Sequence, residues 1–295
     1  METLRRIYRS MRETMYRIAT VISPALNTKM RYHEKFGEKP DLKSPKTFNE
    51  KLLWLKLNRY MRNPLVIQCA DKYRVREYIT ACGYGDILND LLGAWDSPEE
   101  IPWNDLPEQF ALKWNFGAGM NVICHDKSAL DPKIVIEQMK KWGKQKCWLS
   151  HSELQYKYID KKIICERFIE CADQAVIPDY KVYCFNGHPQ AILVMHDRGK
   201  TVKAEFFDAD WNALPTPDKY QAPDVPTEKP ECLSRLLEIS RKLSEPFPFV
   251  RCDFYIVNEK IYFGELTFTP AGGLHTSETT VHGQSMADLL DIRNQ

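Results

Sequence analysis

The sequence predicts an α+β fold, in which antiparallel hairpins and separate helices pack together without regular strand–helix alternation. Two observations predict it. Pairs of alternating apolar and polar segments are joined by short turns, as at 249–268, and helical patterns occur singly between them. The 295 residues are 43% hydrophobic and 12% aromatic, which is typical of a globular protein that buries a sizeable core.

The first element is a basic amphipathic helix. Residues 1–31 contain seven basic side chains and only two acidic ones, Glu2 and Glu13. A stripe of large apolar residues recurs between the charges at helical spacing: Leu4, Ile7, Tyr8, Met11, Met15, Ile18, Val21 and Ile22. Such a stripe either packs on the helix's own domain or lies on an anionic bilayer, and the pattern leaves both uses open.

The chain lacks an apolar run of the ~18 residues that indicate a membrane-spanning helix, and residues 1–31 lack the uninterrupted apolar core of a signal peptide. We therefore expect a cytoplasmic protein, with peripheral contact to the inner membrane face through residues 1–31 as one use of the stripe. Nine scattered cysteines without a CxxC pair fit free thiols in a reducing compartment. The net charge of +1 gives no reason to expect nucleic acid as a partner.

The remaining elements follow from periodicity and from residues that start and stop helices. Ser44 is the expected N-cap of a helix with Pro45 in its first position. A second helix is expected at about 71–82. The predicted order then continues with a strand at 109–114, a loop at 115–121, a helix at 132–148, a strand at 163–169, a hairpin at 180–196, a proline-rich surface loop at 214–230, a helix at about 231–244 and a closing hairpin at 249–268.

The closing hairpin has one register that keeps its two faces chemically distinct. A three-residue loop at 258–260 pairs Asp253 with Glu265 and Arg251 with Thr267. The open end then has one apolar face and one polar face made of these four residues. A two-residue loop would shift every pair by one residue and mix the faces, so we expect the three-residue loop.

Two carboxylates opposite each other in an antiparallel pair have Cβ atoms about 4.5–5.5 Å apart, and like charges there repel. Asp253 and Glu265 therefore need a compensating group. A shared proton, a salt bridge from Arg251 or a bridging divalent cation would each serve. Mg²⁺ is commonly held by one or two carboxylates together with substrate phosphates. The residues alone leave these alternatives open.

Two weaker patterns lie earlier in the chain. Lys113 stands on the first predicted strand, and Gly117 and Gly119 follow it in a loop able to cover a phosphate, although a lone GxG is also an ordinary turn. Lys72 follows Asp71 at the start of a helix, where Asp71 alone would be a capping residue. The catalytic motifs GxSxG and HExxH do not occur in the sequence.

Taken in order, these segments resemble the ATP-grasp superfamily, and more narrowly its TupA-like branch, the teichuronopeptide-biosynthesis proteins described as amidoligases. The resemblance covers roughly residues 25–285. It is carried by SPKTFNEK at 44–51, ADKYRVREY at 70–78, LPEQFALK at 106–113, DYKVYCFNG at 179–187 and GELTF at 264–268.

The resemblance implies an ATP-grasp fold, in which two α+β lobes grip a nucleotide, with an N-terminal helical extension. The implied division is 1–45 for the basic helix and link, 46–105 for an N-terminal pre-grasp domain and 106–295 for the ATP-grasp domain. Within the last, the lid lobe would take about 106–165 and the C-terminal lobe about 166–295.

The resemblance also implies a role for each matching residue. ATP would be bound by the lysines at its phosphates, the glycine loop above them and the groups around adenine and ribose: Lys72, Lys113, Gly117, Gly119, Glu166, Phe168, Ile169, Asp179 and Lys181. Asp253 and Glu265 would hold Mg²⁺, and Arg251 would be the catalytic residue that stabilises the transferred phosphoryl group. The chain departs from the family pattern at Thr267, where most members have a metal-binding asparagine, and at Phe116, where a histidine is expected.

The implied reaction joins a carboxylate to an amine through an acyl phosphate, with ATP and Mg²⁺. The expected partners are an acidic glycan or sugar-nucleotide carboxylate and an amino-acid amine, so that an amino acid is attached to an acidic sugar of a surface polysaccharide. Arg198, His196 and His275 are candidates for contact with these substrates. Two other functions stay open: a glycosyltransferase of polysaccharide biosynthesis, with its DxD spacing at 208–210, and a non-catalytic nucleotide-binding partner.

Overall fold

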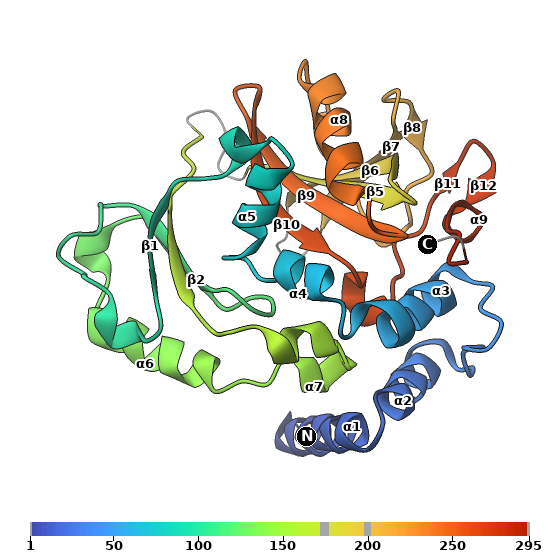
Figure 1. Cartoon of the computed structure of the whole chain (residues 1–295), viewed down its shortest axis with the longest axis horizontal. Coiled ribbons are helices and arrows are strands. Elements are labelled where there is room, and N and C mark those ends of the chain that lie inside the picture. The colour runs from blue at the N-terminus through green and yellow to red at the C-terminus, as the bar shows by residue number, and fades with distance from the viewer. Residues whose placement is uncertain (1, 172–176, 198–201, 294–295) are drawn as a thin grey trace.

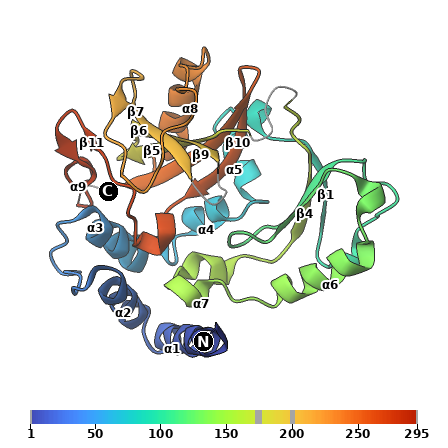
Figure 2. The same cartoon turned by 180° about the vertical axis from the view of Figure 1, so that it is seen from behind.

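The computed structural model describes residues 2–171, 177–197 and 202–293. Two helices begin the chain, α1 (Glu2–Ile22) and α2 (Pro24–Phe36), and they lie along the lower edge of the molecule in Figures 1 and 2. The single N-terminal helix that we expected is therefore two, because Ser23 is extended and Pro24 starts a new helix in its first turn. None of the described helices is long and apolar enough to cross a membrane.

A short helical region follows the N-terminal pair. It contains α3 (Phe48–Leu55), a π-helical turn (Lys56–Tyr60), α4 (Pro64–Ala70) and α5 (Val75–Ala81). Thr47, not Ser44, is the N-cap of α3. The Thr47 hydroxyl accepts a hydrogen bond from the backbone N–H of Glu50, and the Glu50 carboxylate accepts one from the N–H of Thr47. This capping box needs Glu or Gln three residues after the cap, a condition that Ser44 does not meet.

One antiparallel sheet has, within the described residues, the strand order β1 (Leu91–Trp95), β4 (Ile163–Arg167), β2 (Phe110–Trp114) and β3 (Asn121–Cys124). Two helices stand between β3 and β4 in the sequence, α6 (Pro132–Gly143) and α7 (Trp148–His151). The indole N–H of Trp114 on β2 donates to the carbonyl oxygen of Met139 on α6 at 3.0 Å, which fixes that helix against the sheet.

The second antiparallel sheet has, in the part of the chain that is described, the strand order β10 (Lys260–Thr267), β9 (Phe249–Val257), β5 (Asp179–Phe185), β6 (His188–Asp197), β7 (Lys203–Asp208) and β8 (Ala213–Leu214). The helix α8 (Leu233–Ser244) packs on β5, β6 and β9. The described chain ends with a small hairpin, β11 (Thr280–Val281) and β12 (Gln284–Ser285), and α9 (Met286–Leu289). Short 3₁₀ turns connect other elements at Gly85–Ile87, Pro98–Glu100, Lys127–Ala129, Leu154–Tyr158 and Pro270–Gly273.

The two sheets lie on either side of α4 and α5 in both cartoon views (Figures 1 and 2). The strand β5 is buried along its whole length at the centre of the second sheet, which places the hydrophobic core there. The α+β class predicted from the sequence is confirmed, because both sheets are antiparallel and the helices are separate elements beside them.

The β9–β10 hairpin keeps the expected pairs at its open end, where Asp253 lies opposite Glu265. Nearer the loop the predicted register is wrong. The strands are joined by two residues, Asn258 and Glu259, with φ angles of 50° and 61°. Two consecutive positive φ angles are typical of the tight hairpin turns whose twist matches that of the strands.

Gly264 explains why the open end of the hairpin keeps the predicted pairs while the loop end does not. A β-bulge between Phe263 and Glu265 adds one residue to β10, so the pairing shifts by one on passing it. A Cβ at Gly264 would lie 2.9 Å from the carbonyl oxygen of Asp253, too close for any other residue to fit without movement. The polar face at the open end therefore depends on this glycine.

Other differences from the predicted elements are local. The helix expected at 71–82 begins only at Val75. Residues 71–74 form a turn instead, because the Asp71 carboxylate accepts hydrogen bonds from the backbone N–H groups of Tyr73 and Arg74. The helix expected at 132–148 ends at Gly143. The strands β1 and β3 were not expected at all.

Candidate functional site

A cleft of about 700 Å³ lies between the two sheets. Side chains from β2, β3 and β4 line one wall, and side chains from β9 and β10 line the other. The lining includes ten of the residues singled out from the sequence: Lys72, Lys113, Gly117, Gly119, Glu166, Phe168, Ile169, Asp179, Asp253 and Glu265. Arg251 and Lys181 do not line it, but both donate hydrogen bonds to Asp253.

Asp253 is held by two cations. The guanidinium of Arg251 donates from Nε to Oδ1 and from Nη2 to Oδ2, both at 2.6 Å, and the ammonium of Lys181 donates to Oδ2 at 2.8 Å. Burial alone would raise the pKa of Asp253, but Arg251 and Lys181 outweigh it and hold the pKa below its ordinary value. The carboxylate is therefore ionised at neutral pH.

Glu265 is more accessible, with 42% of its side chain exposed. The ammonium of Lys72, which follows α4, lies 3.8 Å from its Oε2. The hydroxyl of Thr267 donates to Oε1 at 3.2 Å and accepts a hydrogen bond from Arg251 at 3.2 Å. A continuous line of polar contacts thus joins Arg251 to Glu265 across the hairpin.

The two carboxylates suit a hard cation such as Mg²⁺. A carboxylate has about four lone-pair positions, and Arg251 and Lys181 occupy three on Asp253, so one remains for a metal ion. Within residues 2–171, 177–197 and 202–293, no group of three His, Cys, Asp or Glu side chains is placed to hold a metal. The donor set therefore fits a cation that shares two carboxylates and takes its other oxygens from a ligand or water.

Lys113 and Glu166 lie on adjacent strands of the first sheet. They are diagonal neighbours, since Lys113 pairs with Ile164 and Glu166 with Ala111. Lys113 Nζ is 2.5 Å from Glu166 Oε2, and the guanidinium of Arg76 on α5 lies 3.4 Å from Oε1. Glu166, which we expect beside the base of a nucleotide, thus also positions Lys113 at the cleft.

Asn115, which sequence reasoning missed, fixes the loop after β2. Its side-chain amide donates to Asp71 Oδ1 at 2.8 Å, and its backbone carbonyl oxygen accepts a hydrogen bond from the backbone N–H of Lys72 at 2.9 Å. Lys72 Nζ then donates to the carbonyl oxygen of Gly117 at 2.6 Å. An asparagine at the end of a strand and directly before a glycine-containing loop was the available signal.

The loop favours glycine at two positions, since Gly117 and Gly119 both have positive φ angles, and only Gly117 also lacks room for a side chain. Gly117 has a φ of 67°, and a Cβ there would lie 2.9 Å from the Sγ of Cys147 and from the Cε of Met120. Phe116 stands where the family resemblance leads us to expect histidine, and it is a core residue, 2% exposed, with its ring 5.6 Å from that of Trp114. The loop therefore offers the cleft its backbone and no imidazole from position 116.

Apolar side chains also line the cleft. Phe168 and Ile169 are among them, and the Phe168 ring lies edge-on to the ring of His125 at 4.8 Å. Asp179 lines the same cleft, is 3% exposed and accepts a hydrogen bond from Lys181 at 2.7 Å. An apolar wall with one buried carboxylate beside it suits a flat heterocycle that carries hydroxyl or amino groups.

Of the three residues considered for substrate contact, the two that the structure describes, His196 and His275, do not line the cleft. His275 is 5% exposed, its Nε2 lies 3.0 Å from the hydroxyl of Tyr183, and burial, helped by Arg251, lowers its pKa to about 3. His196 lies within 2.6 Å of the hydroxyl of Thr227. Arg198 falls outside the described residues.

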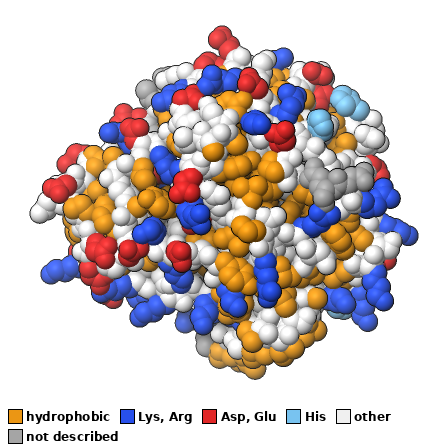
Figure 3. Space-filling view, viewed as in Figure 1, with side chains coloured by type: hydrophobic (Ala, Val, Ile, Leu, Met, Phe, Trp, Pro, Cys, Tyr) orange, Lys and Arg blue, Asp and Glu red, His pale blue; other side chains and the backbone are white. Residues whose placement is uncertain are grey.

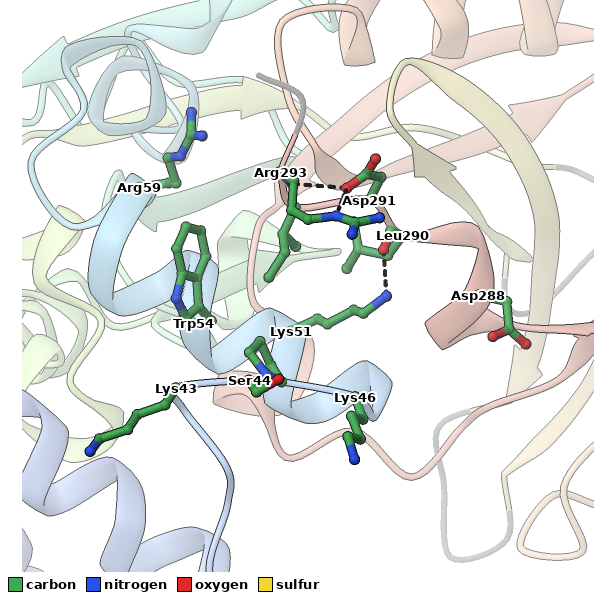
Figure 4. Close-up of a pocket in the computed structure, with 12 residues that line it drawn as sticks. Lys43, Ser44, Lys46, Lys51, Trp54, Arg59, Asp288, Leu290, Asp291 and Arg293 are labelled. Carbon is green, nitrogen blue, oxygen red and sulfur yellow. Dashed lines mark hydrogen bonds and ion pairs between the residues drawn. The ribbon is translucent and has the colours of Figure 1, made fainter.

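A second pocket, of about 800 Å³, lies between α3 and the C-terminal segment (Figure 4). Lys51 extends across it and donates to the carbonyl oxygens of Ala287 and Leu290, both at 2.7 Å. These bonds tie α3 to the end of α9. Residues 44–46 and Lys51, from the first segment that carries the family resemblance, line this pocket. Among the described residues the pocket shares no lining residue with the cleft.

Several solved structures match part of this chain. D-alanine–D-alanine ligase from Bacillus anthracis, complexed with ATP, is 18% identical with a TM-score of 0.42, and the match covers 68% of this chain and 56% of that one. D-alanine–D-alanine ligase from Helicobacter pylori is 17% identical with a TM-score of 0.39, and the match covers 71% of this chain and 53% of that one. N5-carboxyaminoimidazole ribonucleotide synthetase from Thermus thermophilus is 11% identical with a TM-score of 0.42, and the match covers 69% of this chain and 46% of that one. The chain spans about half the length of these proteins.

The match to a family model is more extensive. No curated protein matches the sequence significantly. The family model described as TupA-like ATPgrasp matches residues 50–288, a range that contains both sheets, the cleft and every nucleotide- and metal-binding residue expected from the motifs. The chain belongs to the TupA-like ATPgrasp family.

Proposed function

We propose that the protein is an ATP- and Mg²⁺-dependent ligase that joins a carboxylate to an amine. The polar row on β9 and β10 carries this proposal, since Asp253 and Glu265 line the cleft and Arg251 behind them is connected to both. Lys72 and Lys113 approach the same cleft from other elements. Two oxygen ligands for a cation and several positive charges for phosphate oxygens are what phosphoryl transfer requires.

We propose one direction for ATP in the cleft. Lys72, Lys113 and the loop at Gly117 would bind the phosphates, because Lys72 contacts both Glu265 and the carbonyl oxygen of Gly117. The base would lie beside Phe168 and Ile169. Asp253 and Glu265 would hold Mg²⁺, which would neutralise charge on the transferred phosphoryl group.

The proposed reaction has two steps. An oxygen of the substrate carboxylate attacks the γ-phosphorus of ATP, the bond from that phosphorus to the β–γ bridging oxygen breaks, and ADP leaves. The amine then attacks the carbon of the acyl phosphate, phosphate leaves, and the nitrogen loses a proton as the amide forms. Positioning of the reactants would supply most of the acceleration.

Arg251 has the donors for the charge that develops in both steps. A guanidinium has five N–H donors. The contacts with Asp253 and Thr267 use three of them, and the hydroxyl of Tyr183 is a further hydrogen-bond partner of Arg251. A donor that these groups do not use would bind an oxygen of the transferred phosphoryl group or of the tetrahedral intermediate. A fixed cation at such a position is usually among the largest contributions to catalysis.

We further propose that the amine belongs to an amino acid and the carboxylate to an acidic sugar of a surface polysaccharide or its sugar-nucleotide precursor. The resemblance to teichuronopeptide-biosynthesis proteins supports this substrate class. The reaction would take place in the cytoplasm, where ATP is supplied. All nine cysteines lie in described parts of the chain as free thiols, which supports a reducing compartment.

The test incubates the full chain with ATP, Mg²⁺, uronic acids or UDP-uronic acids, and single amino acids. We expect ADP release that requires both substrates, and a product whose mass equals acid plus amine minus water. Arg251→Lys is expected to reduce turnover by about 10²–10³. EDTA is expected to stop it. ATP turnover without an amide product in any mixture would contradict the ligase proposal.

The glycosyltransferase alternative gains no supporting contact among the described residues. The DxD spacing at 208–210 belongs to a turn, in which Asp208 Oδ1 accepts hydrogen bonds from the backbone N–H groups of Asp210 and Asn212. The same incubation distinguishes the two alternatives. UDP release without ATP consumption indicates a glycosyltransferase, and ATP binding that survives Asp253→Ala without turnover in the parent indicates a non-catalytic partner.

A further inference from the structure

The apolar stripe of α1 faces solvent. Its eight residues are between 46% exposed, at Met15, and 72% exposed, at Leu4 and Ile22. Figure 3 shows hydrophobic side chains gathered at the lower edge of the molecule, where α1 lies in Figure 1. Scattered apolar residues on a surface are ordinary, whereas a contiguous patch of this kind marks an interaction surface.

A different face of α1 attaches it to the protein. Tyr16, Ala19 and Thr20 are buried, and the hydroxyl of Thr20 donates to the carbonyl oxygen of Leu149 on α7 at 2.7 Å. Asn27 on α2 donates to the carbonyl oxygen of Tyr16 at 2.7 Å. Packing on the chain's own domain, one of the two uses expected from the sequence, therefore involves this narrow face and leaves the stripe uncovered.

Basic residues border the stripe on both sides. In a helical projection Arg5 and Arg12 follow one border, and Arg6 and Arg17 follow the other. Arg12 pairs with Glu34 on α2. Arg5, Arg6 and Arg17 form no ion pair with any residue that the structure describes. Each border thus presents long cationic side chains beside apolar ones.

We propose that α1 docks the protein on an anionic lipid bilayer. The helix would lie in the plane of the interface, with its apolar stripe among the upper acyl chains. The arginines at its borders would reach up to the lipid phosphates, as long basic side chains do at membrane interfaces. The hydrogen bonds from α1 and α2 to α7 hold the stripe outward on a fixed base.

Charge favours a bilayer over a second copy of the chain. Two α1 helices that met through their stripes would bring their arginine borders together. Residues 1–31 carry seven basic and two acidic side chains, so that contact would be repulsive. Anionic headgroups place negative charge along both borders at once.

The test is flotation of the full chain with vesicles of two parts phosphatidylcholine and one part phosphatidylglycerol. We expect binding that weakens with added salt and is weak on pure phosphatidylcholine. The double variant Ile7→Asp with Met11→Asp is expected to bind at least tenfold more weakly. Arg5→Gln with Arg6→Gln is expected to lower binding to the anionic vesicles by about thirtyfold.

Ile134→Asp is the matched control, because Ile134 is 69% exposed on a different helix, α6. This variant is expected to bind like the parent chain. All variants change exposed residues away from the cleft, so their circular dichroism and ATP binding should equal those of the parent. Equal vesicle binding by every variant would overturn the proposal. The proposal would also be overturned if the parent chain did not bind vesicles but formed concentration-dependent dimers, and if the variant Ile7→Asp with Met11→Asp did not form them. Neither result bears on the ligase reaction.

Discussion

Lys181 on β5 lies directly opposite Asp253 on β9, and its ammonium donates to Asp253 Oδ2 at 2.8 Å. The same ammonium donates to Asp179 at 2.7 Å, while Arg251 donates to both carboxylate oxygens of Asp253. Two carboxylates and two cations therefore alternate in one buried network. Of the alternatives left open by the sequence, the salt bridge is present, and it leaves one lone pair of Asp253 for a metal ion.

This network predicts that Asp253→Asn destabilises the fold. The variant leaves Lys181 and Arg251 beside a neutral amide while both are mostly buried, and breaking a buried ion pair from one side costs about 3–5 kcal/mol. Urea unfolding followed by circular dichroism measures the change. Glu265→Gln is the matched control. Its carboxylate is 42% exposed, so we expect a loss below about 1 kcal/mol. Equal unfolding midpoints for the two variants would refute the assignment.

A second prediction concerns the β-bulge. Gly264→Ala places a Cβ 2.9 Å from the carbonyl oxygen of Asp253, and backbone there cannot move without disturbing the hairpin. We expect a loss of about 1–3 kcal/mol in unfolding free energy, together with weaker Mg²⁺–ATP binding by calorimetry. Gly85→Ala is the control, since its nearest neighbour, the Thr80 hydroxyl, is 3.4 Å away. Unchanged nucleotide binding in Gly264→Ala would show that the bulge does not position the carboxylates.

The sequence was sufficient to predict the open end of this hairpin but not its loop end. Alternation places Asp253 and Glu265 on one face because shifting either strand would mix apolar and polar faces. Alternation cannot detect the bulge at Gly264, since a glycine has no side chain to assign to a face. Counting back from the open end without it produced a three-residue loop where the chain has two residues, Asn258 and Glu259.

The other features that the sequence did not predict share a cause. The pattern of apolar and polar residues describes a single helix or strand and not the elements that pack against it. The amphipathic pattern predicted helix for α1 correctly, but it cannot say which face meets the rest of the protein. Thr20 contacts α7 and Tyr16 contacts α2, while the stripe is exposed. The edge strand β3 has only four residues, too few for alternation to be seen. Asn115 was missed because its partners, Asp71 and Asp160, are more than 40 positions away in the sequence.

Lys113 is expected to contribute to nucleotide binding through its charge. Lys113→Met should weaken ATP binding by about tenfold to a hundredfold, because a hydrogen bond to a charged group contributes about 1.5–3 kcal/mol. Isothermal calorimetry measures the affinity. Lys133→Met on the exposed side of α6 is the control and should bind ATP like the parent. Equal affinities would mean that Lys113 serves only to pair with Glu166.

Lys56 provides a prediction about pH. Its side chain is buried, and its ammonium donates to the carbonyl oxygens of His151 and Gly272 at 2.9 and 2.8 Å. Burial lowers the pKa of Lys56 from 10.5 to about 8, with Glu153 opposing this change in part. Between those two values the unfolded chain binds more protons than the folded one at this residue. Raising the pH therefore favours the folded state.

We expect the free energy of unfolding of the parent, relative to Lys56→Met, to rise by about 1.5 kcal/mol from about pH 8 to about pH 9.5. One proton taken up on unfolding changes that free energy by about 1.4 kcal/mol for each step of one in pH. Urea titrations of both proteins across that range measure the difference. Cysteines and tyrosines titrate in both proteins alike, so their contributions cancel. A difference that stays constant or falls with pH would mean that the amine of Lys56 reaches water in the folded protein, and that α7 and the turn at Gly272 are not joined through a buried cation.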